Sequence, residues 1–205
     1  MSRLLRTFRG SAVIAVAFAL LSQSGAYAAT VNVSMTSSLR FSPDPAKAML
    51  GDTIKWTNTS TLAHTSTQNT PLALWDSGSV PAGGTFSFTI TAAGLYPYHC
   101  TFHQASGMVG TAGARDIVTP PFGPIGTQFT VKVATVTAPA GFVYDIRKAN
   151  PGGGFTDWMT GVTSTSKTWD STGQAAGMYK FRSRLRNTST GATSGYSPAF
   201  TIQIR

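Results

Sequence analysis

The chain has 205 residues, of which 41% are apolar and 11% charged, so its composition differs clearly from that of disordered chains. Its 21 Gly, 11 Pro and seven acidic residues, all of them Asp, exclude a protein of long helices and favour a β-rich fold. One cysteine and three histidines exclude an intramolecular disulfide and a metal enzyme with several imidazole centres. At most one compact metal site remains.

The first residues have the pattern of an export signal. Arg3, Arg6 and Arg9 precede an apolar run over residues 12–21, and small residues occupy the positions before a cleavage site after Ala28. The run is shorter than the roughly 20 apolar residues that span a bilayer, so we expect no stable membrane anchor. The sequence predicts a signal peptide over residues 1–28 and a periplasmic, secreted or cell-surface protein.

Charge divides the rest of the chain. Removing residues 1–28 lowers the net charge from +9 to +6; residues 29–117 then sum to zero, and residues 118–205 hold the whole excess. A proline-rich stretch at 119–124 lies at this step, where extended chain is favoured. We therefore expect two domains, 29–114 and 115–205.

Alternating apolar and polar residues predict short strands in both halves. In the first half, strands are expected at 31–35, 53–57 and 85–90, with Gly- and Pro-containing turns between them. In the second half, strands are expected in the proline-rich stretch and at 129–133, 142–148, 155–160, 165–170, 177–187 and 196–205. The sequence predicts an all-β protein made of two β-sandwiches.

The residues that can do chemistry are concentrated between Tyr98 and Met108. Cys100, His103 and Met108 offer a thiolate, an imidazole and a thioether within one short segment. Soft sulfur suits Cu(I) and imidazole suits Cu(II), so two His, one Cys and a weak axial Met are typical of a copper site that holds both states. His64, in a polar loop after the 53–57 strand, is the candidate for the second imidazole.

Further motifs accompany these ligands: Gly51-Asp52-Thr53-Ile54-Lys55-Trp56-Thr57-Asn58, Asp76-Ser77-Gly78, Gly94-Leu95-Tyr96 and the ending Cys-x2-His-x4-Met-Val-Gly. Over residues 30–114 they resemble the plastocyanin and pseudoazurin branch of the cupredoxins, which are small blue-copper proteins. The resemblance implies a Greek-key β-sandwich, one type 1 copper cycling between Cu(I) and Cu(II), and single-electron transfer between redox partner proteins. It implies no enzyme activity.

Three positions depart from the family pattern. Thr65 follows the first ligand, where the family commonly has an Asn that ties the ligand loops together, and Phe102 stands where Pro is frequent. The segment after Met108 is rich in Gly, which predicts a short closing strand.

Each ligand has an ordinary structural alternative. Cys100 could be an inert buried thiol, His64 a loop histidine and Met108 a core side chain. Strand alternation points His99 away from Cys100, so we expect it at the surface or packed, outside the copper site.

The same resemblance places His103 nearest the surface. Its apolar surroundings would form a neutral patch for brief docking of a redox partner. The expected members of this docking patch are Leu62, Ala63, Phe102 and Ala105.

The second half resembles a fibronectin type III module, an immunoglobulin-like sandwich. Its final strand pair, 177–182 and 195–198, carries this resemblance, with Tyr179 as the expected corner tyrosine. The usual tryptophan of the second strand is absent, and Val133-Ala134 stands there.

One strand of this module has basic residues at alternate positions, on the face opposite Tyr179, Phe181 and Leu185. This basic stripe could be a solvated face that resists aggregation, or it could bind an anionic envelope polymer or an acidic partner protein. Export and the inward-facing aromatic residues argue against nucleic acid. The stripe comprises Lys180, Arg182, Arg184 and Arg186.

The sequence therefore predicts an exported, monomeric, two-module electron carrier with one copper ion. Two other functions remain open: copper sequestration or delivery with the same ligands, and an adhesion or scaffold protein whose copper module is vestigial.

Overall fold

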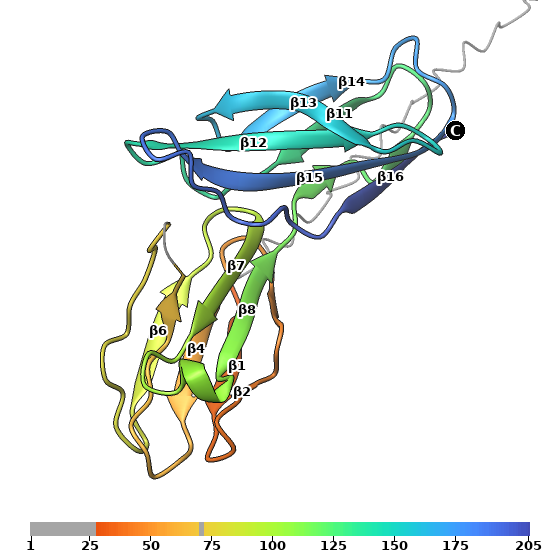
Figure 1. Ribbon diagram of the computed structural model, residues 1–205. Helices are drawn as coiled ribbons and strands as arrows, with labels where there is room; N and C mark the ends of the chain where they lie inside the picture. Colours follow the sequence, from red (N-terminus) through yellow and green to blue (C-terminus); the bar gives the residue numbers. More distant parts are fainter. Residues whose placement is uncertain (1–27, 70–71) are drawn as a thin grey trace, which may run out of the picture.

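The computed structural model describes residues 28–69 and 72–205, and β-strands in four sheets dominate it (Figure 1). The sheets form two β-sandwiches, one from each half of the chain, so the all-β prediction is confirmed. The predicted signal peptide lies outside the described residues except for Ala28. Within the described ranges, no helix is long and apolar enough to cross a membrane.

The first sandwich packs two sheets around one hydrophobic core. One sheet has the order β2-β1-β4-β6, and its strands are β1 (Thr30–Met35), β2 (Phe41–Ser42), β4 (Thr53–Asn58) and β6 (Thr85–Thr89). The other has the order β3-β8-β7-β5, and its strands are β3 (Ala46–Ala48), β5 (Thr67–Gln68), β7 (Gly94–His99) and β8 (Val109–Ala114). Alternate residues of these strands fill the core, including Val33, Ile54, Trp56, Tyr96 and Tyr98.

The closing strand β8 has six residues, as many as β7, so the prediction of a short closing strand is wrong. Its glycines are needed for close packing. A Cβ on Gly110 would lie 2.7 Å from Cζ of Tyr98, and a Cβ on Gly113 would lie 2.6 Å from Cδ2 of Leu95. The Gly-rich sequence makes room for side chains of β7 and does not end the strand.

The second sandwich has one sheet of order β14-β11-β9 and one of order β10-β16-β15-β12-β13. The smaller sheet contains β9 (Ile117–Thr119), β11 (Gln128–Lys132) and β14 (Ser166–Asp170). The larger contains β10 (Phe122–Gly123), β12 (Phe142–Ala149), β13 (Phe155–Val162), β15 (Gly177–Asn187) and β16 (Phe200–Ile204). The proline-rich first strand is thus divided: β9 pairs with β11, whereas β10 pairs with β16 in the opposite sheet.

A buried tyrosine fixes a corner in each sandwich. The Tyr179 hydroxyl donates a 2.9 Å hydrogen bond to the carbonyl of Ala175, four residues earlier, which is the geometry of a tyrosine corner. In the first sandwich, Tyr96 donates in the same way to the carbonyl of Ala92, at 2.8 Å. Each bond fastens the start of a strand to the loop that precedes it.

Backbone hydrogen bonds join the two sandwiches. Leu95 N–H donates to the carbonyl of Gly195 at 2.9 Å, Gly195 N–H donates back at 2.8 Å, and Ala93 N–H donates to the carbonyl of Val133 at 2.8 Å. These bonds lie at the start of β7, whereas Cys100 follows its other end. Since a strand rises about 3.3 Å per residue, the second sandwich is attached roughly 20 Å from Cys100. Figure 1 shows it at the end of the first sandwich opposite the short helix η1 (Gln104–Ser106).

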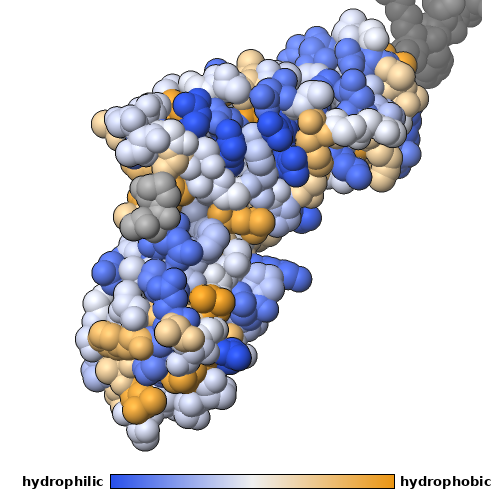
Figure 2. Space-filling view, viewed as in Figure 1, coloured by the Kyte–Doolittle hydropathy of each residue, from blue (hydrophilic) through white to orange (hydrophobic). Residues whose placement is uncertain are grey.

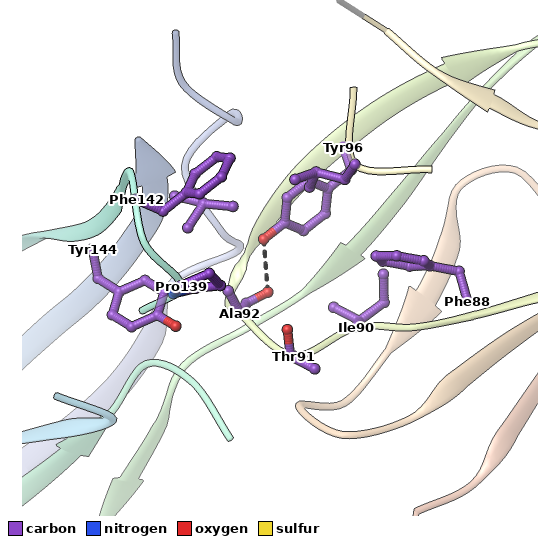
Figure 3. A pocket seen from close by; sticks show the side chains of 10 residues that line it. Phe88, Ile90, Thr91, Ala92, Tyr96, Pro139, Phe142 and Tyr144 are labelled. Atoms are coloured by element: carbon purple, nitrogen blue, oxygen red, sulfur yellow. Dashed lines mark hydrogen bonds between the residues drawn. The ribbon is translucent and has the colours of Figure 1, made fainter. Parts of the chain in front are cut away.

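A cavity of about 170 Å³ remains at this junction. Figure 3 shows Phe88, Ile90 and Tyr96 of the first sandwich on one side of it, and Phe142 and Tyr144 of the second on the other. Both tyrosine hydroxyls already donate to backbone carbonyls. The junction is therefore a mostly apolar contact with incomplete packing.

Asp116 is a buried carboxyl in the linker between β8 and β9. It accepts a hydrogen bond from the Ser183 hydroxyl and a longer one, 3.5 Å, from Ser197. Burial raises the pKa of Asp116 to about 7, because these hydroxyls only partly replace the water that would solvate its charge.

Replacing Asp116 by Asn tests this effect. In wild type the folded protein retains the Asp116 proton between about pH 4 and 7, whereas the unfolded chain loses it, so this contribution to stability falls as pH rises through that window. We expect the free energy of unfolding of Asp116→Asn, relative to wild type, to increase by about 2–3 kcal/mol from pH 5 to pH 8 in urea titrations. A difference between the two proteins that is independent of pH would contradict the raised pKa.

Candidate metal centre

Two loops at the same end of the first sandwich supply the candidate ligands. His64 follows β4 after a short loop, and its backbone is held by paired hydrogen bonds with Val80, of 3.1 and 2.8 Å. Cys100 and His103 follow β7, in a tight turn where His103 N–H donates to the carbonyl of Cys100 at 3.1 Å. The strands β4 and β7 thus position both loops at the same end of the first sandwich.

Three of the four predicted ligands converge there. Their donor atoms, Nδ1 of His64, Sγ of Cys100 and Nδ1 of His103, all lie within 4.8 Å of one another. The two nitrogens are 3.2 Å apart, and the sulfur is 3.8 Å from His64 Nδ1 and 3.4 Å from His103 Nδ1. His64 and Cys100 are fully buried and His103 is partly exposed.

The spacing of these atoms fits one transition-metal ion. Nitrogen and sulfur ligands bound at about 2.0–2.3 Å to one such ion stand about 3.3–3.8 Å apart. The observed separations of 3.4 and 3.8 Å lie in this range, and the N–N separation of 3.2 Å lies just below it. Among the residues that the structure describes, no carboxylate belongs to the cluster. A site with one thiolate and two imidazoles selects a soft or borderline metal such as copper or zinc and disfavours magnesium or calcium.

Met108, the fourth predicted ligand, closes the second loop through backbone hydrogen bonds. Its side chain is fully buried in the core that contains Cys100. Cys100 N–H donates to the carbonyl of Met108 at 3.0 Å, and Met108 N–H donates to the carbonyl of His103 at 3.2 Å. The loop is therefore closed on itself, with Met108 adjacent to Cys100 across the β7–β8 pair.

Thr65 ties the two ligand loops together. Its backbone N–H donates to Sγ of Cys100 at 3.3 Å, and its hydroxyl oxygen accepts from the N–H of Thr101 at 2.8 Å. These contacts span 35 and 36 residues of sequence. A threonine thus ties the loops together at the position where the sequence resemblance leads us to expect Asn.

Sequence reasoning missed a buried polar group behind His64. Ser60 Oγ lies 2.8 Å from Nε2 of His64, and Asn58 accepts a 2.9 Å hydrogen bond from the N–H of Ser60. All three side chains are buried. Serine and asparagine are frequent in loops of this chain, so the sequence offered no signal that these two were special.

The electrostatics of the site favour neutral imidazole. Burial lowers the pKa of His64, and the nearby His103 lowers it further because two imidazolium charges would repel. Neutral histidine is the form that binds a metal.

His99 and Arg40 lie near the centre with other partners. His99 is half-buried, and its Nδ1 is 2.7 Å from Oδ1 of Asn69, outside the ligand cluster, as alternation predicted. Arg40, which sequence reasoning missed, donates to the carbonyl of Gly107 at 3.1 Å. It thereby holds the segment between His103 and Met108 from outside.

The expected docking patch lies on the exposed side of these loops. All four of its residues are exposed, with Leu62 and Phe102 at 49% and 55%, and the Phe102 ring stands edge-on to His103 at a centroid distance of 6.4 Å. Figure 2 shows hydrophobic patches near this end of the first sandwich. The members are Leu62, Ala63, Phe102 and Ala105.

The basic stripe lies on β15, on the far module. Arg184 and Arg186 both bond the carboxylate of Asp145, with closest N–O distances of 3.3 and 2.7 Å. Burial alone would raise the pKa of Asp145, but the hydrogen bonds from Arg186 and Gly161 and the two charges outweigh it, so that pKa is lowered. Two of the four predicted cations are thus paired.

Aromatic rings also cover this face. The Arg182 guanidinium lies 4.0 Å from the ring centre of Phe155 and 4.8 Å from that of Tyr196, and Arg184 also lies over Tyr196 at 4.7 Å. The expectation that aromatic residues face only the core holds for Tyr179 and Phe181 but is wrong for the stripe as a whole. The covering rings come from β13 and from the segment before β16, whose position the sequence of β15 does not reveal.

Part of the chain matches a known protein family. Residues 28–113 match the family model of copper binding proteins, the plastocyanin/azurin family. The matched segment contains the first sandwich and all four predicted ligands, and it makes up less than half of the chain. Proteins of that family bind copper, and the cluster of His64, Cys100 and His103 fits a copper site.

Similar solved structures include several copper proteins. A mutant of amicyanin in its Cu(I) form shares 22% identity, with 42% of this chain and 81% of that chain covered and a TM-score of 0.38. A purple cupredoxin from Nitrosopumilus maritimus shares 22% identity over 41% of this chain and 98% of its own, with a TM-score of 0.37. A mutant plastocyanin of fern shares 17% identity over 40% and 98%, also with a TM-score of 0.37.

Proposed function

We propose that this protein carries single electrons at a type 1 copper site formed by His64, Cys100, His103 and Met108. The observation that supports this most strongly is the convergence of one buried sulfur and two imidazole nitrogens within 4.8 Å. Copper bound there would supply reversible one-electron chemistry between Cu(I) and Cu(II).

The surrounding residues hold the donor atoms in one arrangement. Thr65 N–H donates to the Cys100 sulfur and thereby helps to fix the position of that sulfur. Thr65 and Thr101 fix the distance between the loops, and Arg40 holds the segment before Met108. Because these hydrogen bonds restrict the ligand loops, the donor atoms would move little when the charge of a bound copper ion changes. A small structural change makes electron transfer fast, so this rigidity suits an electron carrier better than a protein that must release its metal.

The partly exposed His103 gives this site a route to the surface. It lies beside the exposed Phe102 ring, and the apolar docking patch suits short-lived contacts with a redox partner protein. Copper sequestration or delivery would use the same ligands without needing this patch. A vestigial module in an adhesion or scaffold protein would not need to retain a converged donor set.

Replacing Phe102 by Asp separates electron transfer from copper storage. We expect the copper-loaded variant to keep its visible spectrum, while electron self-exchange, measured by NMR line broadening, slows about tenfold because two like charges meet in the encounter complex. Met178→Asp is the control, since Met178 is equally exposed, at 54%, on the other module. Wild-type copper protein that does not exchange electrons would favour storage, and equal exchange in both variants would place docking elsewhere.

We also propose that the second module is a fibronectin type III-like sandwich without catalytic activity. The strand order, the division of its first strand between two sheets and the corner bond of Tyr179 support this assignment. Its attachment at the end remote from Cys100 suits a spacer or an anchor that leaves the docking patch free. We further propose that the protein is exported, in line with the predicted signal peptide, and that it is a monomer.

The basic stripe is proposed to bind an anionic envelope polymer. Lys180 is exposed, and Arg182 makes no ion pair within the described residues, whereas Asp145 already neutralises part of the charge on Arg184 and Arg186. Figure 2 shows strongly hydrophilic residues gathered over β12 and β15. The half-buried Tyr196 ring lies among the arginines of this face, so DNA is included in the test as an alternative ligand.

A charge-matched pair of variants tests this stripe. We expect Lys180→Gln/Arg182→Gln to elute from a dextran sulfate column at clearly lower salt than wild type, since surface ion contacts are screened within about 8 Å at physiological ionic strength. Lys47→Gln/Lys55→Gln removes the same charge from the first sandwich and should elute like wild type. Equal shifts for both variants would show a net-charge effect only, and stronger retention on DNA than on dextran sulfate would favour nucleic acid.

A further inference from the structure

The loop between β4 and His64 contains a buried polar network that ends on the His64 ring. Asn58, Ser60 and His64 are 1%, 6% and 0% exposed. Asn58 Nδ2 donates to the carbonyls of Leu62 and Val80 at 2.7 and 2.9 Å, which leaves Asn58 Oδ1 as an acceptor facing Ser60. Buried polar groups of this kind must be satisfied, so the direction of each hydrogen bond can be followed.

The Ser60 hydroxyl has one proton and two lone pairs. Leu62 N–H donates to one lone pair at 3.1 Å. Asn58 Oδ1 at 2.9 Å and the carbonyl of Leu62 at 3.0 Å can only accept, so a Ser60 proton aimed at His64 would leave both oxygens facing the Ser60 oxygen with no proton between them. We therefore assign the Ser60 proton to one of these two oxygens, and the remaining lone pair of Ser60 accepts from Nε2 of His64, which lies 2.8 Å away.

This direction determines the tautomer of His64. A neutral imidazole has one N–H, so a proton on Nε2 leaves Nδ1 unprotonated with its lone pair available. Nδ1 is the atom that faces Cys100 and His103. The same hydrogen bond also limits rotation of the ring, because turning it would leave the buried Nε2–H of His64 without its acceptor.

We propose that Ser60 is a positioning residue: its hydroxyl holds the Nε2–H tautomer of His64 and aims Nδ1 into the metal site. The tautomer assignment does not depend on the proposed function, whereas the effect on copper binding rests on the proposed function. Outer-shell partners of ligand histidines typically change metal affinity by 10–100-fold when removed.

The first test uses metal-free protein at one alkaline pH, where the histidines are neutral. Long-range 15N–1H NMR should show a single Nε2–H tautomer for His64 in wild type and a mixture of both tautomers in Ser60→Ala, while His99, which bonds Asn69 outside the ligand cluster, serves as the internal reference. Ser66→Ala is the matched control, because Ser66 is equally buried and its hydroxyl bonds Trp75 instead. A wild-type Nδ1–H tautomer, or an unchanged His64 in Ser60→Ala, would overturn the proposal.

The second test measures Cu(II) affinity by chelator competition. We expect Ser60→Ala to bind about 10–100-fold more weakly than wild type, with Ser66→Ala near wild type and Ser60→Thr restoring most of the loss. Equal affinities for Ser60→Ala and Ser66→Ala would refute the positioning role in metal binding. Wild type that shows the Nε2–H tautomer but binds no copper would refute the proposed function and leave the Ser60 hydrogen bond established.

Discussion

The candidate metal centre depends on one constraint: two loops that are 35 to 36 residues apart must be held against each other with a buried sulfur between them. Thr65 satisfies it from one side, because its N–H reaches the Cys100 sulfur while its hydroxyl accepts from Thr101. Each of these bonds is worth about 1 kcal/mol, but leaving a buried partner unsatisfied costs about 1–3 kcal/mol. The loops therefore have one favourable arrangement, and the three donor atoms converge in it.

The strands of the first sandwich support these loops. β7 begins at the junction with the second module and ends at the ligand turn, and β8 returns along its whole length because glycines admit the Tyr98 and Leu95 side chains. Anchoring the second sandwich at the start of β7 leaves the ligand end free. In this arrangement the candidate metal centre lies at one end of the first sandwich and the second module is joined to the other end.

Features that depend on residues close together in the sequence could be predicted from the sequence. The spacing of Cys100, His103 and Met108 within one turn and the alternation of the strands sufficed for the ligand loop and the all-β fold. Contacts set by strand register could not be predicted in this way. Asp145 faces Arg184 and Arg186 only because β12 pairs with β15 in one register, and Ser60 is placed behind His64 only by the path of the loop after β4.

The glycines of β8 led to a wrong prediction for the same reason, because their effect depends on a neighbouring strand. Glycine usually weakens a strand, and that general rule predicted a short one. The neighbouring strand decides the outcome here, because Tyr98 and Leu95 occupy the space that side chains at Gly110 and Gly113 would need. Which rule applies depends on packing that a single sequence does not show.

The most direct measurement of the central claim is the visible absorption spectrum of Cu(II)-loaded protein, with Cys100→Ser beside it. A short bond between copper and the Cys100 sulfur in a site with two histidines predicts an intense thiolate-to-copper band in the red, and the variant should lack it while remaining folded. Wild type without that band, or a variant that retains it, would contradict a copper site built on Cys100.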